Sequence, residues 1–316
     1  MPSSLIASFV VASAFVSACA GEPRVVRPAE PEIERRAGDD PEPPAIPPPP
    51  DHDVVMAVDA VVVEVRVPSG PVRGQILMLP GWSFDRRETC WRSSFCEEAL
   101  AKGYLLVLAG MDKSIYAGRV YSETRSDMAH YKTRTWVTER FIPALQRRLH
   151  VLLPGGDNYL YGMSTGGRGV ALLAMHTGSL FKAGAALSGD FDMTEETNDP
   201  LLLLHYGSYR RFPERWTGDD NPAMHVDRIT VPLYIASGTD DRTVSPSQSV
   251  KFHAKMQSAH PDLDVRLHMV DGGGHDFDFW GGETGRVLEF FAAHGTAPAA
   301  DPDGVRRELE PAPSPP

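Results

Sequence analysis

The chain has 316 residues, of which 42% are hydrophobic and 23% are charged, and this composition is ordinary for a globular protein. Its formal net charge of −11 argues against nucleic-acid binding, which needs a basic face on the protein. Residues 21–53 and 297–316 are crowded with Pro and acidic side chains that cannot bury a core. We therefore expect a disordered linker and a disordered tail around one domain over residues 54–296.

The first 20 residues are typical of an export signal. The apolar run from Leu5 to Val16 is too short for a membrane-spanning helix, although no Lys or Arg precedes it. Val16-Ser17-Ala18-Cys19 resembles a bacterial lipobox, which would make Cys19 a lipidated first residue. Ala18-Cys19-Ala20 also fits a cleavage site that would discard Cys19. We favour the lipoprotein route, because the Pro-rich segment after it would serve as a tether; an uncleaved anchor is a third alternative.

Within the domain, apolar strand-like runs alternate with helix-like segments. The strands are expected over residues 56–67, 75–79, 104–109, from 158, 183–187, 233–237 and 265–270. The helices are expected over residues 97–102, 135–149, from 165, 247–258 and 287–294. This alternation predicts an α/β fold with a mostly parallel sheet covered by helices on both faces. Residues 190–230 interrupt it and predict a short irregular cap.

The two cysteines inside the domain are Cys90 and Cys96. An exported chain enters an oxidising compartment, where the two thiols could pair. On one unbroken helix they would lie about 9 Å apart along its axis, which is too far for a disulfide. A bridge therefore requires Cys90 to lie in the loop before the helix, and two buried free thiols are the alternative.

Gly162-Met163-Ser164-Thr165-Gly166-Gly167 joins a strand-like run to a helix-like run. G-x-S-x-G in this context predicts a sharp strand-to-helix turn that exposes the Ser164 hydroxyl as a nucleophile. The glycines fit this turn, because side chains there would clash where the strand and the helix approach.

A serine nucleophile needs a base and an acid to orient that base. His275 follows the last predicted strand in a glycine-rich loop and is the expected base. Asp241, in the loop after the strand at 233–237, is the expected acid, with Asp240 as its close rival. Asp190 and Asp192 are remoter candidates. The order Ser, Asp, His is that of α/β-hydrolases.

The negative oxygen formed on attack needs two hydrogen-bond donors. The N–H of Thr165, at the start of the helix after the nucleophile, is expected to supply one. The N–H of Trp82, in the loop after the strand at 75–79, is expected to supply the other. Neither a metal site nor a cofactor site is expected.

The region from about Val72 to His294 resembles the α/β-hydrolase superfamily. Within it, the chain looks like the esterase D branch of S-formylglutathione hydrolases, feruloyl esterases and mycolyltransferases. The residues that carry the resemblance are Leu79-Pro80-Gly81, Trp136 to Leu149, Gly162 to Gly167, Phe181 to Gly189 and Asn221-Pro222. The chain departs from this branch at Thr165, where the branch often has Met. The resemblance implies carboxylic ester chemistry through an acyl group.

The sequence therefore predicts an exported serine esterase that acts on a small-molecule or polymer-borne ester. A serine peptidase or an acyltransferase on the same fold are alternatives within this chemistry. A lipoprotein that binds a ligand without catalysis is an alternative from another class. Trp82, Tyr116, Tyr121, Trp216 and Trp280 are candidates for an aromatic substrate pocket or for packing.

Overall fold

The computed structural model describes residues 54–295. The expectations for the export signal, for lipidation at Cys19, for the linker and for the tail lie outside these residues. Within the described range, no helix combines the length and the apolar character needed to span a membrane.

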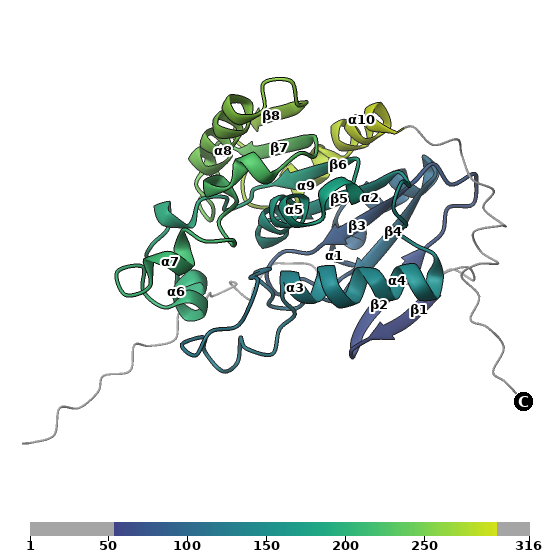
Figure 1. Cartoon of the computed structure of the whole chain (residues 1–316). Helices are drawn as coiled ribbons and strands as arrows, with labels where there is room; N and C mark the ends of the chain where they lie inside the picture. The colour runs from purple at the N-terminus through teal and green to yellow at the C-terminus, as the bar shows by residue number, and fades with distance from the viewer. Residues whose placement is uncertain (1–53, 296–316) are drawn as a thin grey trace, which may run out of the picture. The chain divides into compact units, whose positions relative to one another are not determined.

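One eight-stranded sheet forms the centre of the domain, in the order β1-β2-β4-β3-β5-β6-β7-β8 (Figure 1). All strand pairs from β4 to β8 are parallel, whereas β2 pairs antiparallel with both β1 and β4. The strands are β1 Val54–Val58, β2 Val61–Arg66, β3 Gly74–Leu79, β4 Tyr104–Ala109, β5 Asn158–Met163, β6 Ala183–Leu187, β7 Leu233–Gly238 and β8 Val265–Val270. The predicted mostly parallel sheet is confirmed.

The prediction of one strand over residues 56–67 is wrong, because the chain turns back on itself within this run. Asp59 and Ala60 adopt positive φ angles of 48° and 67°, and β1 pairs with β2 across them. Two-residue hairpin turns of this kind usually carry Gly or Asn. Alanine rarely adopts this conformation, so nothing in the valine-rich run indicated a turn.

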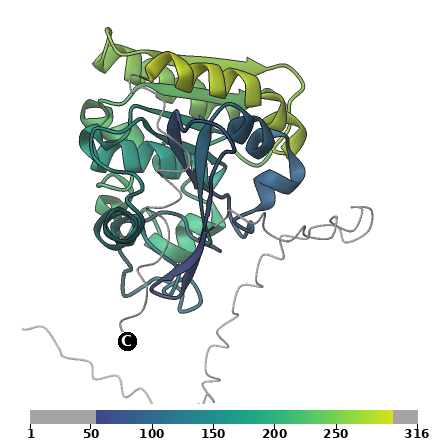
Figure 2. The same cartoon turned by 90° about the vertical axis from the view of Figure 1, so that its right-hand side faces the viewer.

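Helices cover both faces of the sheet, as the two views show (Figures 1 and 2). On β3, Leu77 and Leu79 belong to one core cluster with residues of α4, α5 and α8. Ile76 and Met78 belong to the other cluster, with residues of α2, α9 and α10. The helices are α1 Glu88–Arg92, α2 Phe95–Ala101, α3 Arg134–Trp136, α4 Ile142–Leu149, α5 Thr165–His176, α6 Pro200–Tyr206, α7 Pro213–Trp216, α8 Pro246–Ala259, α9 Phe277–Gly282 and α10 Thr284–His294.

The helix expected over residues 135–149 is present, but a π-helical turn over Val137–Phe141 separates α3 from α4. The segment 190–230 contains the short helices α6 and α7 rather than being wholly irregular. It has a small core of its own, which includes Tyr206 and Trp216 and extends to Ile115 in the loop after β4. The cap is therefore packed against the loop after β4.

Cys90 and Cys96 form a disulfide with 5.0 Å between their Cα atoms. The expectation that Cys90 must lie in a loop is wrong, because it lies in the separate short helix α1. The extended backbone of Ser93 ends α1 before α2 begins at Phe95, so the chain bends between the cysteines. This bend brings together two residues that one straight helix would hold apart.

Replacing Cys90 and Cys96 together by Ala should lower the free energy of unfolding by about 2 kcal/mol. The reason is that a short cross-link still restricts the unfolded chain. Urea unfolding of the variant and of the oxidised wild type measures the difference. Equal stabilities, or two titratable thiols in the purified wild type, would contradict the disulfide.

Candidate active site

Ser164 lies on a strained turn between β5 and α5. Its φ and ψ angles are 56° and −128°, which few residues other than glycine adopt. A Cβ atom added to Gly166 would lie 2.0 Å from the carbonyl oxygen of Leu79, and one added to Gly162 would lie 2.3 Å from that of Gly166. The glycines are thus required by the close approach of β3, β5 and α5.

The structure brings together the three side chains that the sequence placed after separate strands. His275 Nε2 lies 2.9 Å from Ser164 Oγ, and His275 Nδ1 lies 2.7 Å from Asp241 Oδ2. All three lie at the carboxyl ends of β5, β7 and β8. This arrangement can transfer a proton from the hydroxyl to the imidazole while the carboxylate orients the ring.

The carboxylate of Asp241 is held in its charged form. Burial by itself would raise the pKa of Asp241, but the hydrogen bond with His275 and the backbone N–H donors of Val244 and Thr243 bring it below its ordinary value. Both backbone donors bind Oδ1 at 2.9 Å, which leaves Oδ2 for the imidazole. The charge and the orientation of the carboxylate are therefore fixed together.

The other candidate acids do not contact His275. Asp240 is exposed, and its backbone N–H donates to the carbonyl oxygen of Gly273. Asp192 binds Lys255 at 2.9 Å. Asp190 lies 3.5 Å from the buried guanidinium of Arg168. The geometry thus favours Asp241 over its rivals.

The two N–H groups expected to bind the oxyanion lie on either side of Ser164. Thr165 opens α5, where the first N–H groups have no partner within the helix. Trp82 follows Gly81, and a Cβ atom on Gly81 would lie 3.3 Å from Ser164 Cβ. In the part of the chain that the structure describes, neither N–H donates to another protein group. Both are available to a ligand oxygen.

Most of the proposed aromatic pocket residues are packing residues. Trp216 and Tyr116 are fully buried, and Trp280 is 2% exposed. Trp82 is half-buried against the cap cluster, as is Tyr121. Trp82 follows Gly81, which lies against Ser164.

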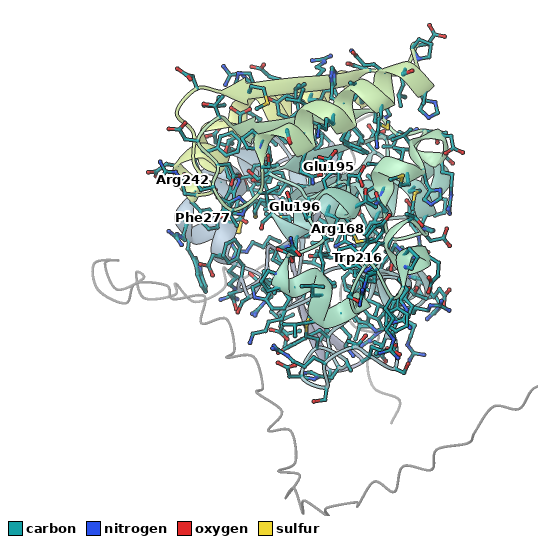
Figure 3. All side chains as sticks on the ribbon, turned by 90° about the vertical axis from the view of Figure 1, so that its left-hand side faces the viewer. Arg168, Glu195, Glu196, Trp216, Arg242 and Phe277 are labelled. Carbon is teal, nitrogen blue, oxygen red and sulfur yellow. A yellow bond between two sulfur atoms is a disulfide. The ribbon has the colours of Figure 1, made fainter. Side chains whose placement is uncertain are left out.

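Sequence reasoning named Trp280 only as a candidate for a pocket or for packing, and it did not name Arg168. Trp280, in the unexpected helix α9, packs edge-on against the ring of His275 at 5.0 Å and donates to Ser188 Oγ at 3.2 Å. Arg168, four residues after Ser164, is fully buried and donates to the hydroxyl of Tyr206 at 2.8 Å and to the carbonyl oxygen of Asp220 at 3.1 Å (Figure 3). A charged residue one helical turn after the nucleophile was the available signal for Arg168.

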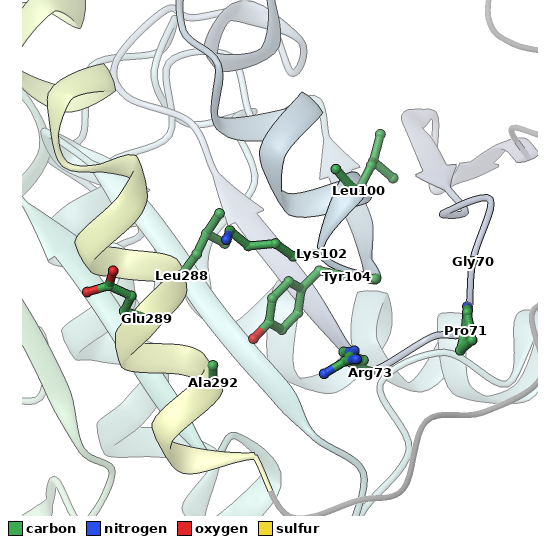
Figure 4. A pocket seen from close by; sticks show the side chains of 11 residues that line it. Gly70, Pro71, Arg73, Leu100, Lys102, Tyr104, Leu288, Glu289 and Ala292 are labelled. Atoms are coloured by element: carbon green, nitrogen blue, oxygen red, sulfur yellow. The ribbon is translucent and has the colours of Figure 1, made fainter.

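A cavity of about 440 Å³ lies away from these residues, between α2 and α10 (Figure 4). Its lining includes Arg73, Lys102, Tyr104 and Leu288. Tyr104 begins β4, so the cavity lies at the amino end of the parallel strands, whereas Ser164 follows the carboxyl end of β5. Within the described range, no group of three or more His, Cys, Asp or Glu residues is arranged to hold a metal ion.

The fold of this chain is shared with known structures. An S-formylglutathione hydrolase from Agrobacterium tumefaciens is 16% identical with a TM-score of 0.61, over 77% of this chain and 94% of that chain. The chain has the α/β-hydrolase fold. A ferulic acid esterase shares this fold at 18% identity and a TM-score of 0.55, over 77% of this chain and 96% of that chain. The expected resemblance to the esterase D branch is therefore confirmed for the fold.

Peptidases with the α/β-hydrolase fold are also similar to this chain. Residues 157–294 match the prolyl oligopeptidase family. An acylaminoacyl peptidase is 13% identical with a TM-score of 0.57, and the match covers 80% of this chain but 43% of that longer chain. No curated protein matches this chain by sequence.

Asp190 should make the protein less stable as the pH rises from about 4 to about 6. Burial raises the pKa of Asp190 from 3.8 to about 6 against the opposing effect of Arg168. The folded state then holds the proton that the unfolded chain has released, so unfolding becomes more favourable as the pH rises through this window. The shift corresponds to about 3 kcal/mol.

Asp190→Asn should remove this pH dependence, because Asn stays neutral. Urea unfolding at pH 4, 5, 6 and 7 should give two curves that diverge by about 2–3 kcal/mol, with the variant relatively more stable at pH 7. Parallel curves would contradict the raised pKa.

Proposed function

We propose that this protein is a serine hydrolase that cleaves carboxylic esters through an acyl-enzyme. The observation that carries the proposal is the contact chain from Ser164 Oγ through His275 to Asp241. Beside it lie two N–H groups that have no protein acceptor within residues 54–295. The fold similarity to an S-formylglutathione hydrolase and a ferulic acid esterase supports ester chemistry.

In the first half of the reaction, Ser164 Oγ attacks the ester carbonyl carbon while His275 Nε2 takes its proton. The N–H groups of Trp82 and Thr165 stabilise the oxyanion of the tetrahedral intermediate. Asp241 stabilises the imidazolium that forms. The intermediate collapses when the alcohol leaves with the proton from His275, and the acyl group remains on Ser164.

In the second half, His275 takes a proton from water, which attacks the acyl carbonyl carbon. The acid is released, and the proton returns to Ser164. An alcohol in place of water would give acyl transfer, so product analysis with added acceptor alcohols separates hydrolase from acyltransferase.

A peptidase is the second candidate, since residues 157–294 match the prolyl oligopeptidase family. The same residues would then attack an amide carbonyl. An ester and an anilide of the same acyl group distinguish the two, because an esterase turns over the ester alone at a useful rate. A panel of esters that differ in acyl length, with aromatic acyl groups included, would define the substrate.

We further propose that the protein acts after export, anchored through a lipidated Cys19 or released by cleavage. The Cys90–Cys96 disulfide supports this location, because structural disulfides persist in oxidising compartments. Mass spectrometry of the mature N-terminus separates lipidation from cleavage after Ala20.

Ser164→Ala should lower kcat on short p-nitrophenyl esters by about 10³-fold or more, because it removes the hydroxyl on which the acyl-enzyme forms. A fluorophosphonate probe should label the wild type and fail to label the variant. Ser179→Ala, at an exposed serine, is the control and should behave as wild type. Retained turnover in Ser164→Ala would refute the mechanism, and an unlabelled, inactive wild type would favour a non-catalytic ligand-binding protein.

Asp241→Asn should lower kcat by about 10²- to 10⁴-fold, because an amide can hold the imidazole in the wrong tautomer and cannot stabilise its cation. Asp240→Asn should change kcat by less than about threefold, since its side chain is exposed. Steady-state kinetics of the two variants provides the comparison. A larger loss in Asp240→Asn would reverse the assignment.

A further inference from the structure

Glu64, on β2, is a fully buried carboxylate surrounded by arginines. Arg66 Nε lies 2.6 Å from Oε1, Arg86 Nε lies 3.4 Å from Oε2, and Arg87 Nε donates a hydrogen bond to Oε2. Burial would raise the pKa of Glu64, but the hydrogen bonds from Arg87 and Arg66 lower it below its ordinary value. The buried carboxylate of Glu64 is thus paired with three guanidinium groups.

Two of these arginines end the loop that presents the Trp82 N–H. This loop, residues 80–87, leaves β3 at Leu79 and enters α1 at Glu88. Its backbone is held beside the next loop by two hydrogen bonds of 2.9 Å. The Ser83 N–H donates to the carbonyl oxygen of Asp112, and the Tyr116 hydroxyl donates to the carbonyl oxygen of Pro80.

Close packing does not hold the loop on the side of the β1–β2 turn. A cavity of about 270 Å³ lies there, lined by Phe84, Asp85 and Arg86 of the loop and by Asp59 and Ala60 of the turn. An unfilled space leaves room for the loop to shift. The ion pairs to Glu64 are therefore the contacts that tie this part of the loop to the sheet.

The loop is linked to the base through the aromatic rings of α9. Phe84 packs against Phe277 and Trp280 with ring centroids 5.4 Å and 6.0 Å apart, and Trp280 packs against His275. A shift of the loop would therefore move the Trp82 N–H relative to Ser164 and disturb the packing around His275. Misplacing a catalytic group by about 1 Å can cost about 10²-fold in rate.

We propose that Glu64 is a positioning residue for this hydrolase, which fixes the loop 80–87 through Arg86 and Arg87 so that the Trp82 N–H meets the oxyanion. The proposal rests on the proposed function. Glu64 does not touch substrate. It acts through the loop, so its loss should weaken binding of the transition state more than binding of the ground-state ester.

Glu64→Gln tests this, because it removes the charge and keeps the size of the side chain. We expect kcat on p-nitrophenyl esters to fall about tenfold or more while KM changes less than about threefold. Arg87→Gln breaks the same contact from the loop side and serves if Glu64→Gln does not fold. The double variant should be no slower than the slower single variant, because both remove one interaction.

Glu283→Gln is the matched control. Glu283 is equally buried and contacts Tyr234, His268 and Arg286, none of which belongs to the loop. The Glu283→Gln variant should have a lower melting temperature than the wild type. Its kcat should stay within about twofold of wild type when all assays are run well below the lowest melting temperature.

The outcomes separate the two proposals. If Ser164→Ala is inactive and Glu64→Gln keeps wild-type kcat, the positioning role is wrong and the hydrolase proposal stands. If Glu64→Gln and Glu283→Gln lose kcat equally, the effect is general destabilisation and the positioning role is again wrong. If Ser164→Ala keeps its activity, the proposed function itself fails.

Discussion

The active site depends on the close approach of three backbones around Ser164. Gly166 lies against the end of β3, Gly162 lies against the first turn of α5, and a Cβ atom on Gly167 would lie 2.6 Å from the carbonyl oxygen of Leu187 at the end of β6. The Ser164 N–H also donates to that carbonyl oxygen at 2.9 Å. The strained φ of Ser164 is thus maintained by its neighbours on both sides, and the hydroxyl is held toward His275.

Buried charge is handled in two different ways around this turn. Arg168 is satisfied mainly by neutral acceptors, the hydroxyl of Tyr206 and the carbonyl oxygen of Asp220, with Asp190 at a longer distance. The carboxylate of Glu64 is paired with three guanidinium groups in the described part of the chain. Arg168 holds the cap against α5. Glu64 holds loop 80–87 against β2. Each charge is costly to bury and therefore restricts the positions of its partners.

The sequence was sufficient for the parallel part of the sheet and for the three residues that meet at Ser164. Each of these residues follows a strand, and parallel strands end on one edge of the sheet. It was insufficient where long-range contacts override local pattern. The hairpin turn at Ala60 contains no glycine or asparagine that would indicate a turn. Cys90 lies in a helix that is too short to show a helical pattern of apolar residues. Trp280 belongs to the six-residue helix α9, which was not among the expected helices. Its position beside His275 depends on Phe84, which is nearly two hundred residues away in the chain.

That contact between Phe84 and α9 has a consequence for biogenesis. Loop 80–87 belongs to the first third of the domain, whereas Phe277 and Trp280 belong to its last part. Contacts so distant in the chain form late, since the intervening segments must be ordered first. A chain that emerges from its N-terminus can therefore form the turn around Ser164 while His275 is still unfolded. The contact between Ser164 and His275 would form only once the final helices have docked.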